Sequence, residues 1–323
     1  MEKYSKIKDE LLKSGLPLES MVADSVRSLS AKLPSPLLNT GQYFFERSES
    51  ELANSVDFQV VYDLDIKNCD FVEIAFLIEC KYRTKGTGWL FTDSPLKDAG
   101  MEFFVENFFS KGKCGKENFP VLAPPLNNSD IPAVGKGIEI YSNGNRNEKS
   151  ITEGIHQLMF ACCSSLSRAF FSEEQMRKPM MDRKIDITNR SWHSLLCPVL
   201  VTTANLYHVK NPTIEKIEES EKLEDICSRE ALVAYSTPRP PPYVGRFIRE
   251  QVFQEIKGMV SLEGKPNSKT DESHARIYLT NLSFLNPSRY YIVDYGRFGS
   301  FLKDYIDFAS SMVSYASKKG SGH

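Results

Sequence analysis

Two alternating runs joined by a short polar connection constrain the fold more than any other part of the sequence. SVDFQVVYDLD (residues 55–65) and EIAFLIECKYR (residues 73–83) both repeat with the two-residue period of a β-strand. The connection IKNCD (residues 66–70) is short enough for a hairpin. We therefore expect two long antiparallel strands that lie side by side in a sheet.

The second run carries charges at the end of an otherwise apolar strand. Period-two geometry places Glu79 and Lys81 on one face of this strand and Cys80 on the other. Burying a carboxylate or an ammonium group is unfavourable unless the charge is paired or bound to something. The two charges therefore require either a solvated position or a functional role.

The register of the hairpin selects a third charged residue. If the hairpin is centred on Asn68, Asp57 lies opposite Glu79, and Asp63 lies opposite Glu73 at the far end. A turn shifted by two residues would still leave Asp57 within diagonal reach of Glu79. We therefore expect Asp57, rather than Asp63, beside the charged pair.

This combination of residues suits metal-assisted hydrolysis of a phosphodiester. Two carboxylates one strand apart repel each other unless a divalent cation bridges them, and hard oxygen ligands favour Mg²⁺ or Mn²⁺. Lys81 beside them can orient a metal-bound water or neutralise charge that develops on a phosphate. The structural alternative is a surface ion pair between Glu79 and Lys81, typically worth less than about 1 kcal/mol, with Asp57 in a solvated turn.

Helical and strand patterns alternate along the rest of the chain, which favours an α/β fold. Helices are expected over residues 1–14, 17–33, 151–171 and 242–260, and strands over residues 41–47, 195–209 and 229–237, with a final strand and helix over 289–316. Residues 84–150 are rich in Gly, Pro and Asn, and we expect an irregular insert there.

Asp57 followed by Glu79-Cys80-Lys81 at the end of a strand resembles the motif of the PD-(D/E)XK nuclease superfamily, which has a restriction-endonuclease-like fold. Members share a helix, a three-strand antiparallel meander that carries the motif, a second helix and a further strand. The same order is expected here over about residues 17–208. The resemblance implies a single domain over 1–323 with a central mixed β-sheet flanked by helices, a long insert over about 84–150 and a C-terminal extension over about 209–316.

The resemblance also implies residue roles. Asp57 and Glu79 would bind Mg²⁺ or Mn²⁺, and Lys81 would be the catalytic lysine. Many members add an acidic ligand from the first core helix, and Glu19 matches that position. Val56 stands where the name of the motif has proline, which is a common variation.

The resemblance implies a metal-dependent nuclease that acts on DNA rather than RNA. By analogy with standalone members, the expected role is a prokaryotic restriction or phage-defence effector. One alternative is a catalytically silent nuclease fold that serves in binding or as a scaffold, and another is an enzyme that acts on nucleotides or other small phosphates. Three residues are candidate nucleic-acid contacts: Arg183 and Lys184 in a basic loop, and Gln157 in the later helix. The alternative for the two basic residues is a merely solvated loop, and the alternative for Gln157 is a role in packing.

Net charge and hydropathy limit the expected partners and the expected location of the protein. The 323 residues include 40 basic and 42 acidic side chains, so the net charge of -2 gives no global signal for nucleic acid. A local patch, a homo-oligomer or an activating partner would then supply part of the grip on a polyanion. No stretch approaches the roughly eighteen apolar residues of a membrane helix, and the first residues lack the apolar core of a signal peptide, so we expect a cytoplasmic protein without a membrane contact.

Overall fold

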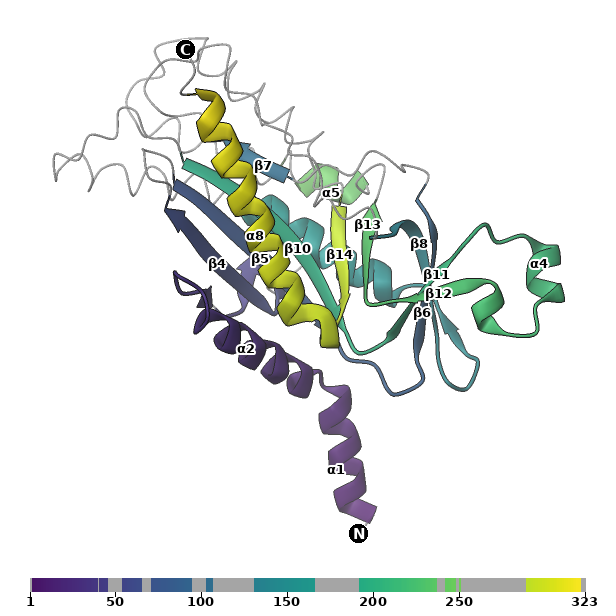
Figure 1. Ribbon diagram of the computed structural model, residues 1–323. Helices are drawn as coiled ribbons and strands as arrows, with labels where there is room; N and C mark the ends of the chain where they lie inside the picture. Colours follow the sequence, from purple (N-terminus) through teal and green to yellow (C-terminus); the bar gives the residue numbers. More distant parts are fainter. Residues whose placement is uncertain are drawn as a thin grey trace.

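A mixed β-sheet forms the centre of the structure, and helices flank it (Figure 1). The structure is a computed structural model, and it describes residues 2–39, 41–45, 54–65, 71–94, 103–106, 131–165, 192–236, 242–247, 250 and 289–320. Within these residues the α/β class and the central mixed sheet expected from the sequence are confirmed.

The sheet has 12 strands and contains both parallel and antiparallel pairs. Its order is β1 (Leu38–Asn39), β4 (Phe58–Asp65), β5 (Phe71–Lys81), β10 (Trp192–Thr202), β14 (Arg289–Asp294), β13 (Leu232–Ser236), β8 (Ala133–Ile140), β6 (Gly88–Asp93), β11 (Asn205–Val209) and β12 (Cys227–Glu230). In addition, β7 (Phe103–Glu106) pairs with β10, and β9 (Arg146–Asn147) pairs with β8.

The helices and a separate two-stranded ladder complete the described structure. The helical elements are α1 (Glu2–Lys13), α2 (Leu16–Ser30), the helix of residues 150–165, α4 (Ile214–Glu219), the 3-10 turn η1 (Leu223–Asp225), α5 (Pro242–Phe247) and α8 (Tyr295–Gly320). The ladder pairs β2 (Tyr43–Phe45) with β3 (Asn54–Val56). No helix within the described residues is long and apolar enough to cross a membrane.

The central hairpin has the register expected from the sequence. Strands β4 and β5 are antiparallel, with Phe58 opposite Ile78 and Asp63 opposite Glu73. Strand β5 also pairs in parallel with β10 along its whole length, from Phe71 beside Trp192 to Lys81 beside Thr202. The hairpin is therefore continued by a third long strand, which places β5 in the interior of the sheet.

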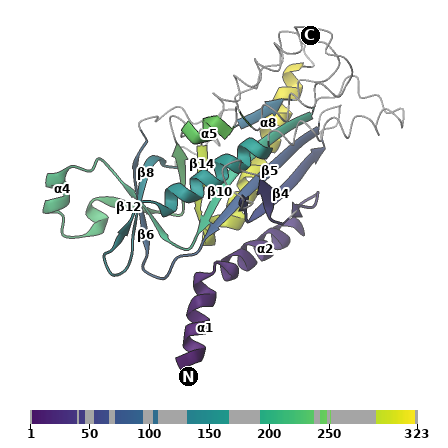
Figure 2. The same ribbon diagram turned by 180° about the vertical axis from the view of Figure 1, so that it is seen from behind.

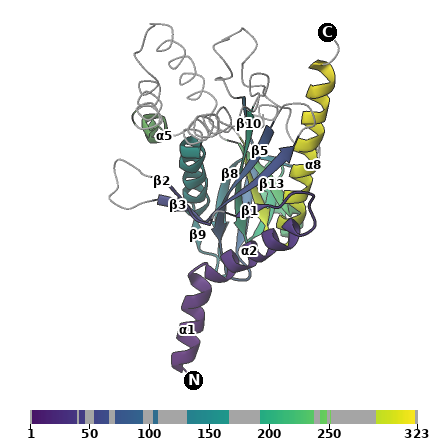
Figure 3. The same ribbon diagram turned by 90° about the vertical axis from the view of Figure 1, so that its left-hand side faces the viewer.

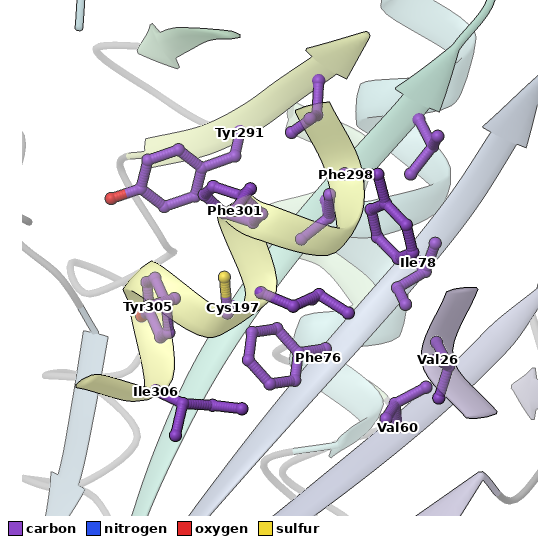
Figure 4. Close-up of a cluster of buried hydrophobic side chains, with 14 of the residues drawn as sticks. Val26, Val60, Phe76, Ile78, Cys197, Tyr291, Phe298, Phe301, Tyr305 and Ile306 are labelled. Atoms are coloured by element: carbon purple, nitrogen blue, oxygen red, sulfur yellow. The ribbon is translucent and has the colours of Figure 1, made fainter. Parts of the chain in front are cut away.

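Both faces of β5 are covered, which explains why its sequence is apolar at almost every position. Phe76 and Ile78 pack against α2 and α8, and the rings of Phe76 and Tyr305 meet edge to face at 5.5 Å between centroids (Figure 4). Ala75 and Leu77 belong to the core on the opposite face, which the helix of residues 150–165 covers. Figure 3 shows the sheet nearly edge on between these two helical layers, and Figure 2 shows the layer of residues 150–165 in front.

The first strand of the expected meander is present but interrupted. Leu38 faces Val61 in the β1–β4 pair, and Tyr43 faces Val56 in the β2–β3 pair. The number of residues from Leu38 to Tyr43 equals the number from Val56 to Val61 on the partner strand. The two ladders therefore share one antiparallel register. The interruption lies beside Asp57, which therefore sits at a break in the ladder.

Residues 84–150 differ from the irregular insert expected there. Their described part contains β6, β7, β8 and β9, and both β6 and β8 belong to the central sheet. Trp89 and Phe91 are fully buried on one face of the short strand β6, and the residues that alternate with them after Trp89 are less buried. Glycine and proline in the flanking segments obscured this short alternation in the sequence.

Two strands expected to be continuous are divided. The run 195–209 breaks after Thr202, and the new strand β11 pairs with β6 instead of β5. Strand β5 also ends beside Thr202, so the two neighbouring strands end at the same level of the sheet. The sequence pattern of a single segment does not reveal this coincidence. The run 229–237 likewise divides into β12 and β13.

Strands β13 and β14 belong to the segment that was expected to form a C-terminal extension, but they lie within the central sheet. The expected single domain over residues 1–323 stays a prediction.

The close approach of the helix of residues 150–165 to the sheet depends on Gly154. A methyl group at Gly154 would lie 2.9 Å from Leu200 Cδ1 and 3.4 Å from Lys81 Cε. We expect Gly154→Ala to destabilise the protein by about 1–3 kcal/mol, because overpacking forces neighbouring side chains and backbone to move. Urea unfolding of the variant and the wild-type protein measures this difference.

Gly299→Ala is the matched control, because the same substitution in α8 meets nothing within 4 Å. Alanine favours a helix over glycine by about 0.5–1 kcal/mol, so this variant should be at least as stable as the wild type. Equal losses of stability in the two variants would contradict a tight approach at Gly154.

Candidate active site

The three residues of the predicted motif converge at the carboxyl end of β5. Asp57 Oδ2 accepts a hydrogen bond of 2.6 Å from the backbone N–H of Cys80, the residue between Glu79 and Lys81. Lys81 Nζ forms an ion pair of 2.6 Å with Glu79 Oε1. The bend at Asp57 therefore turns its carboxylate toward β5, beside the charged pair.

Glu19 belongs to the same electrostatic group. Helix α2 begins at Leu16, after Gly15 with its left-handed φ of 83°, and Glu19 lies in the first turn. Partial burial raises the pKa of Glu19, and the charge of Asp57 raises it further. The charges of Glu19 and Asp57 therefore interact, and the role of Glu19 as an additional metal ligand stays a prediction.

Glu79 is the most strongly perturbed of these carboxylates. Burial is the main cause that raises its pKa to about 7, and the charges of Asp57 and Glu19 act in the same direction, whereas Lys81 opposes the shift. Glu79 Oε2 is buried and has no hydrogen-bond partner within the described structure. Lys81 thus compensates one oxygen of this carboxylate and leaves the other without a polar partner.

Asp57 experiences opposing influences. Burial raises its pKa, whereas the hydrogen bond from the Cys80 backbone and the positive charge of Lys81 lower the pKa. The net shift is upward, as for Glu79 and Glu19. All three carboxyl groups are therefore less easily ionised than in water, and a nearby cation would favour the charged form of each.

A side chain from the opposite layer holds Lys81 in place. Lys81 Nζ donates a hydrogen bond of 2.9 Å to Gln157 Oε1, and Gln157 Nε2 donates to the backbone carbonyl of Ser55 at 3.5 Å. Ser55 belongs to β3, immediately before the bend at Asp57. Gln157, expected either to pack or to contact nucleic acid, therefore connects the lysine to the strand that carries Asp57.

Neither of the two remaining candidate nucleic-acid contacts is placed by the structure. Arg183 and Lys184 fall outside the described residues. His156, next to Gln157, directs its ring to the hydroxyl of Tyr243, with Nε2 at 3.0 Å. Trp89 of β6 is fully buried in the core.

The sequence reading missed a buried charged pair just beyond the motif. Arg83 Nε forms an ion pair with the fully buried Glu139 of β8, and Ser150 at the start of the helix of residues 150–165 also donates to this carboxylate. The Arg83 guanidinium lies 5.6 Å from the centroid of the Trp89 ring. Residues 133–140 (AVGKGIEI) alternate weakly, and this was the available signal for a strand that carries Glu139.

Threonines secure the same end of the sheet. Thr202 Oγ1 donates a hydrogen bond of 2.8 Å to the carbonyl of Lys81, and Thr203 Oγ1 accepts one of 2.7 Å from the N–H of Arg83. These bonds satisfy backbone groups where β5 and β10 both stop. They therefore hold the backbone that carries Lys81.

The cluster offers carboxylate oxygens suited to a hard divalent cation, although the described residues contain no group of three His, Cys, Asp or Glu side chains already arranged around a metal position. The buried Glu79 Oε2 without a partner fits such a cation. Asp57, Glu79 and Glu19 are the residues that would hold it. Because 23% of the Lys81 side chain is exposed, solvent reaches this end of β5.

The fold and the site together define a mixed α/β protein with a carboxylate–lysine cluster where two central strands end. Comparisons with protein-family models, with curated proteins and with solved structures found no match to this chain. The assignment of a chemical role therefore depends on the residues of the cluster.

The raised pKa of Glu79 predicts a defined loss of stability with pH. Its contribution to the free energy of unfolding is fully present below the ordinary pKa of 4.5 and is lost as pH rises through about 7, since the folded state holds the proton more tightly than the unfolded state. Glu79→Gln carries no such charge. Between pH 5 and pH 8 we expect the variant to gain about 2 kcal/mol of stability relative to the wild type.

Urea unfolding at the two pH values measures the effect. Glu153→Gln, which neutralises an exposed carboxylate on the helix of residues 150–165, is the control and should follow the wild type. A constant difference between Glu79→Gln and the wild type at both pH values would contradict the raised pKa.

Proposed function

We propose that the protein is a metal-dependent nuclease of the PD-(D/E)XK type, which hydrolyses phosphodiester bonds in DNA. The observation that carries the proposal is the convergence of Asp57, Glu79 and Lys81 at the end of β5, with one oxygen of the buried Glu79 carboxylate left without a partner. A surface ion pair, the structural alternative, does not fit a carboxylate that is buried and has a raised pKa.

The order of elements supports a restriction-endonuclease-like core. After α2, an interrupted strand, the β3–β4 strand and β5 form an antiparallel meander, and the helix of residues 150–165 and then β10 follow. Strand β10 runs parallel to β5. This is the order implied by the resemblance, except that β6, β7, β8 and β9 come between β5 and the second helix along the chain and join the sheet at other positions.

Each residue has a defined role in the proposed reaction. Asp57 and Glu79, with Glu19 as an additional ligand, would hold Mg²⁺ or Mn²⁺, which supplies Lewis acidity and a more acidic bound water. Lys81, positioned by Gln157, would stabilise negative charge on the phosphate in the transition state and orient the attacking water. The Thr202 bond to the carbonyl of Lys81 holds the backbone during this step.

The choice of DNA, and a role in prokaryotic restriction or defence against phage, rest on analogy with standalone nucleases of this type. The second candidate function is binding or scaffolding by a silent nuclease fold. The observation that favours the scaffold is the ion pair of Lys81 with Glu79. In this contact the proposed catalytic lysine and a proposed metal ligand bind each other instead of a substrate or a metal. The two candidates differ in what a divalent cation does to the protein.

Removal of Lys81 tests catalysis. Plasmid, linear and single-stranded DNA and RNA are incubated with the wild type and with Lys81→Ala, in Mg²⁺, Mn²⁺ or EDTA. We expect DNA cleavage that requires the metal and falls about 100-fold or more in the variant, because transition-state charge is no longer neutralised. Lys136→Ala, an exposed lysine of β8, should cleave normally.

The pattern of products separates the alternatives. Normal cleavage by Lys81→Ala would contradict its catalytic role, provided that circular dichroism shows the same fold as the wild type. Cleavage of RNA but not of DNA would show that RNA, and not DNA, is the substrate. Turnover of free nucleotides without polymer cleavage would favour the small-phosphate enzyme.

Metal binding tests the carboxylates independently of cleavage. We expect Mn²⁺ to raise the melting temperature of the wild type, since a ligand that binds only the folded state stabilises it by about 3 kcal/mol at 100 times its Kd. Asp57→Asn should lose this response. Asp63→Asn in β4, the strand that follows the bend at Asp57, is the matched control, because Asp63 is exposed and faces Glu73 at the far end of the hairpin.

A wild-type protein that neither cleaves nor responds to Mn²⁺ would favour the scaffold. A response to Mn²⁺ that is lost in Asp57→Asn, without cleavage of any polymer, would indicate a nuclease that requires an activating partner. An equal response in Asp57→Asn would contradict the assignment of Asp57 as a ligand.

A further inference from the structure

The corner between α1 and α2 lies next to one of the three carboxylates of the candidate site. Figure 1 shows two separate helices that meet where the chain changes direction. Ser14 closes the last turn of α1, because its backbone N–H donates to the carbonyl of Glu10 at 3.0 Å. Its hydroxyl accepts a bond of 3.4 Å from the N–H of Leu16, the first residue of α2. Gly15 is therefore the residue at which the chain turns.

Gly15 has a left-handed backbone conformation, with φ of 83° and ψ of -24°. Glycine adopts this conformation without the steric penalty that a side chain brings. The carbonyl of Gly15 accepts hydrogen bonds from the N–H groups of Leu18 at 2.9 Å and of Glu19 at 3.1 Å. The backbone of Glu19 is thus bound directly to this glycine.

The side chain of Glu19 folds back beside the same glycine. A methyl group on Gly15 would lie 3.3 Å from Glu19 Oε1, which is tighter than nine in ten contacts of real Cβ atoms. The carboxylate is the free end of a flexible side chain, so an added Cβ atom would displace the carboxylate by a few tenths of an ångström. The missing side chain of Gly15 therefore leaves room for the Glu19 carboxylate in its observed position.

From this position the Glu19 carboxylate interacts with both other carboxylates of the site. The buried side chains of Leu18 and Val22 anchor α2 in the core and so fix the rotation of the helix. Burial, followed by the charge of Asp57, raises the pKa of Glu19. Burial is also the main cause of the raised pKa of Glu79, and the charge of Glu19 adds to this shift. Glu19 is therefore within electrostatic reach of Asp57 and Glu79.

We propose that Gly15 is a positioning residue for the metal site, because its missing side chain leaves the space from which the Glu19 carboxylate serves as the third carboxylate ligand. The inference rests on the proposed function, since it requires that Asp57 and Glu79 bind Mg²⁺ or Mn²⁺. Mg²⁺ demands a near-ideal octahedron of oxygen ligands. A carboxylate displaced by a few tenths of an ångström therefore binds the cation less well.

Two substitutions separate this role from a purely structural one. In the structural alternative, Gly15 is required only for the left-handed turn that ends a helix. Gly15→Asn keeps that turn accessible, because asparagine adopts the left-handed conformation more readily than most residues, but it adds the Cβ atom that meets Glu19. Gly15→Ala adds the same atom and also strains the backbone. The structural alternative therefore leaves Mn²⁺ binding of Gly15→Asn unchanged, whereas the proposal requires a loss in both variants.

Titration of the full-length protein with Mn²⁺, followed by the electron paramagnetic resonance signal of the free ion, measures the Kd without relying on cleavage. We expect Gly15→Asn and Gly15→Ala each to raise the Kd about 10-fold, as is common when a group that orients a metal ligand is changed. Gly144→Asn and Gly144→Ala are the matched controls, because Gly144 has nearly the same φ of 82° but a Cβ atom there meets nothing within 4 Å. Both controls should bind Mn²⁺ as the wild type does.

A double-mutant cycle tests whether the effect of Gly15 passes through Glu19. Glu19→Ala alone should weaken Mn²⁺ binding, and the addition of Gly15→Asn should weaken it no further, because the carboxylate that the new Cβ atom displaces is gone. Wild-type affinity in Gly15→Asn would overturn the proposal. So would a second loss of affinity in the double variant as large as the loss that Gly15→Asn causes alone.

Failure of this inference and failure of the proposed function give different results. If Gly15 serves only the turn, Gly15→Asn binds Mn²⁺ with wild-type affinity while Asp57→Asn does not bind the ion. If the wild type itself does not bind Mn²⁺, the proposed metal site and this inference are both overturned.

Discussion

The parallel pairing of β5 with β10 supports the rest of the structure. The ladder extends over the full length of both strands, and both faces of β5 are buried, by α2 and α8 on one side and by the helix of residues 150–165 on the other. A strand in this position places its last residues where both neighbouring strands stop and solvent begins. That boundary is the one place on β5 where charged side chains can be both positioned by the core and accessible.

The charges at this boundary depend on one another and on partners from two other elements. Lys81 compensates Glu79, Gln157 of the facing helix holds Lys81, and the bend before β4 turns Asp57 to the backbone of Cys80. A buried carboxylate with an upward-shifted pKa is unfavourable for folding when it is ionised. Such a group is costly for a purely structural role, and a cation-binding role gives a physical reason for it.

Much of this arrangement was accessible from local patterns. The register of one hairpin, centred on Asn68, was enough to pair Asp63 with Glu73 and to select Asp57 as the neighbour of Glu79, because a short connection leaves little freedom. The long strands and helices were recognised by their period. The short strands β6 and β8 were not, since few residues and flanking glycines leave no clear period, and the buried pair of Arg83 with Glu139 was missed with them.

The sequence by itself determined the α/β class, the hairpin and the identity of the charged residues at its end, since each of these follows from local periodicity and side-chain chemistry. Only the tertiary structure decided that Gln157 contacts Lys81, that Gly154 lets the helix approach the sheet, and that β5 and β10 break together. These contacts join residues far apart in the chain. Their geometry arises from the packing of layers against each other, which no local pattern encodes.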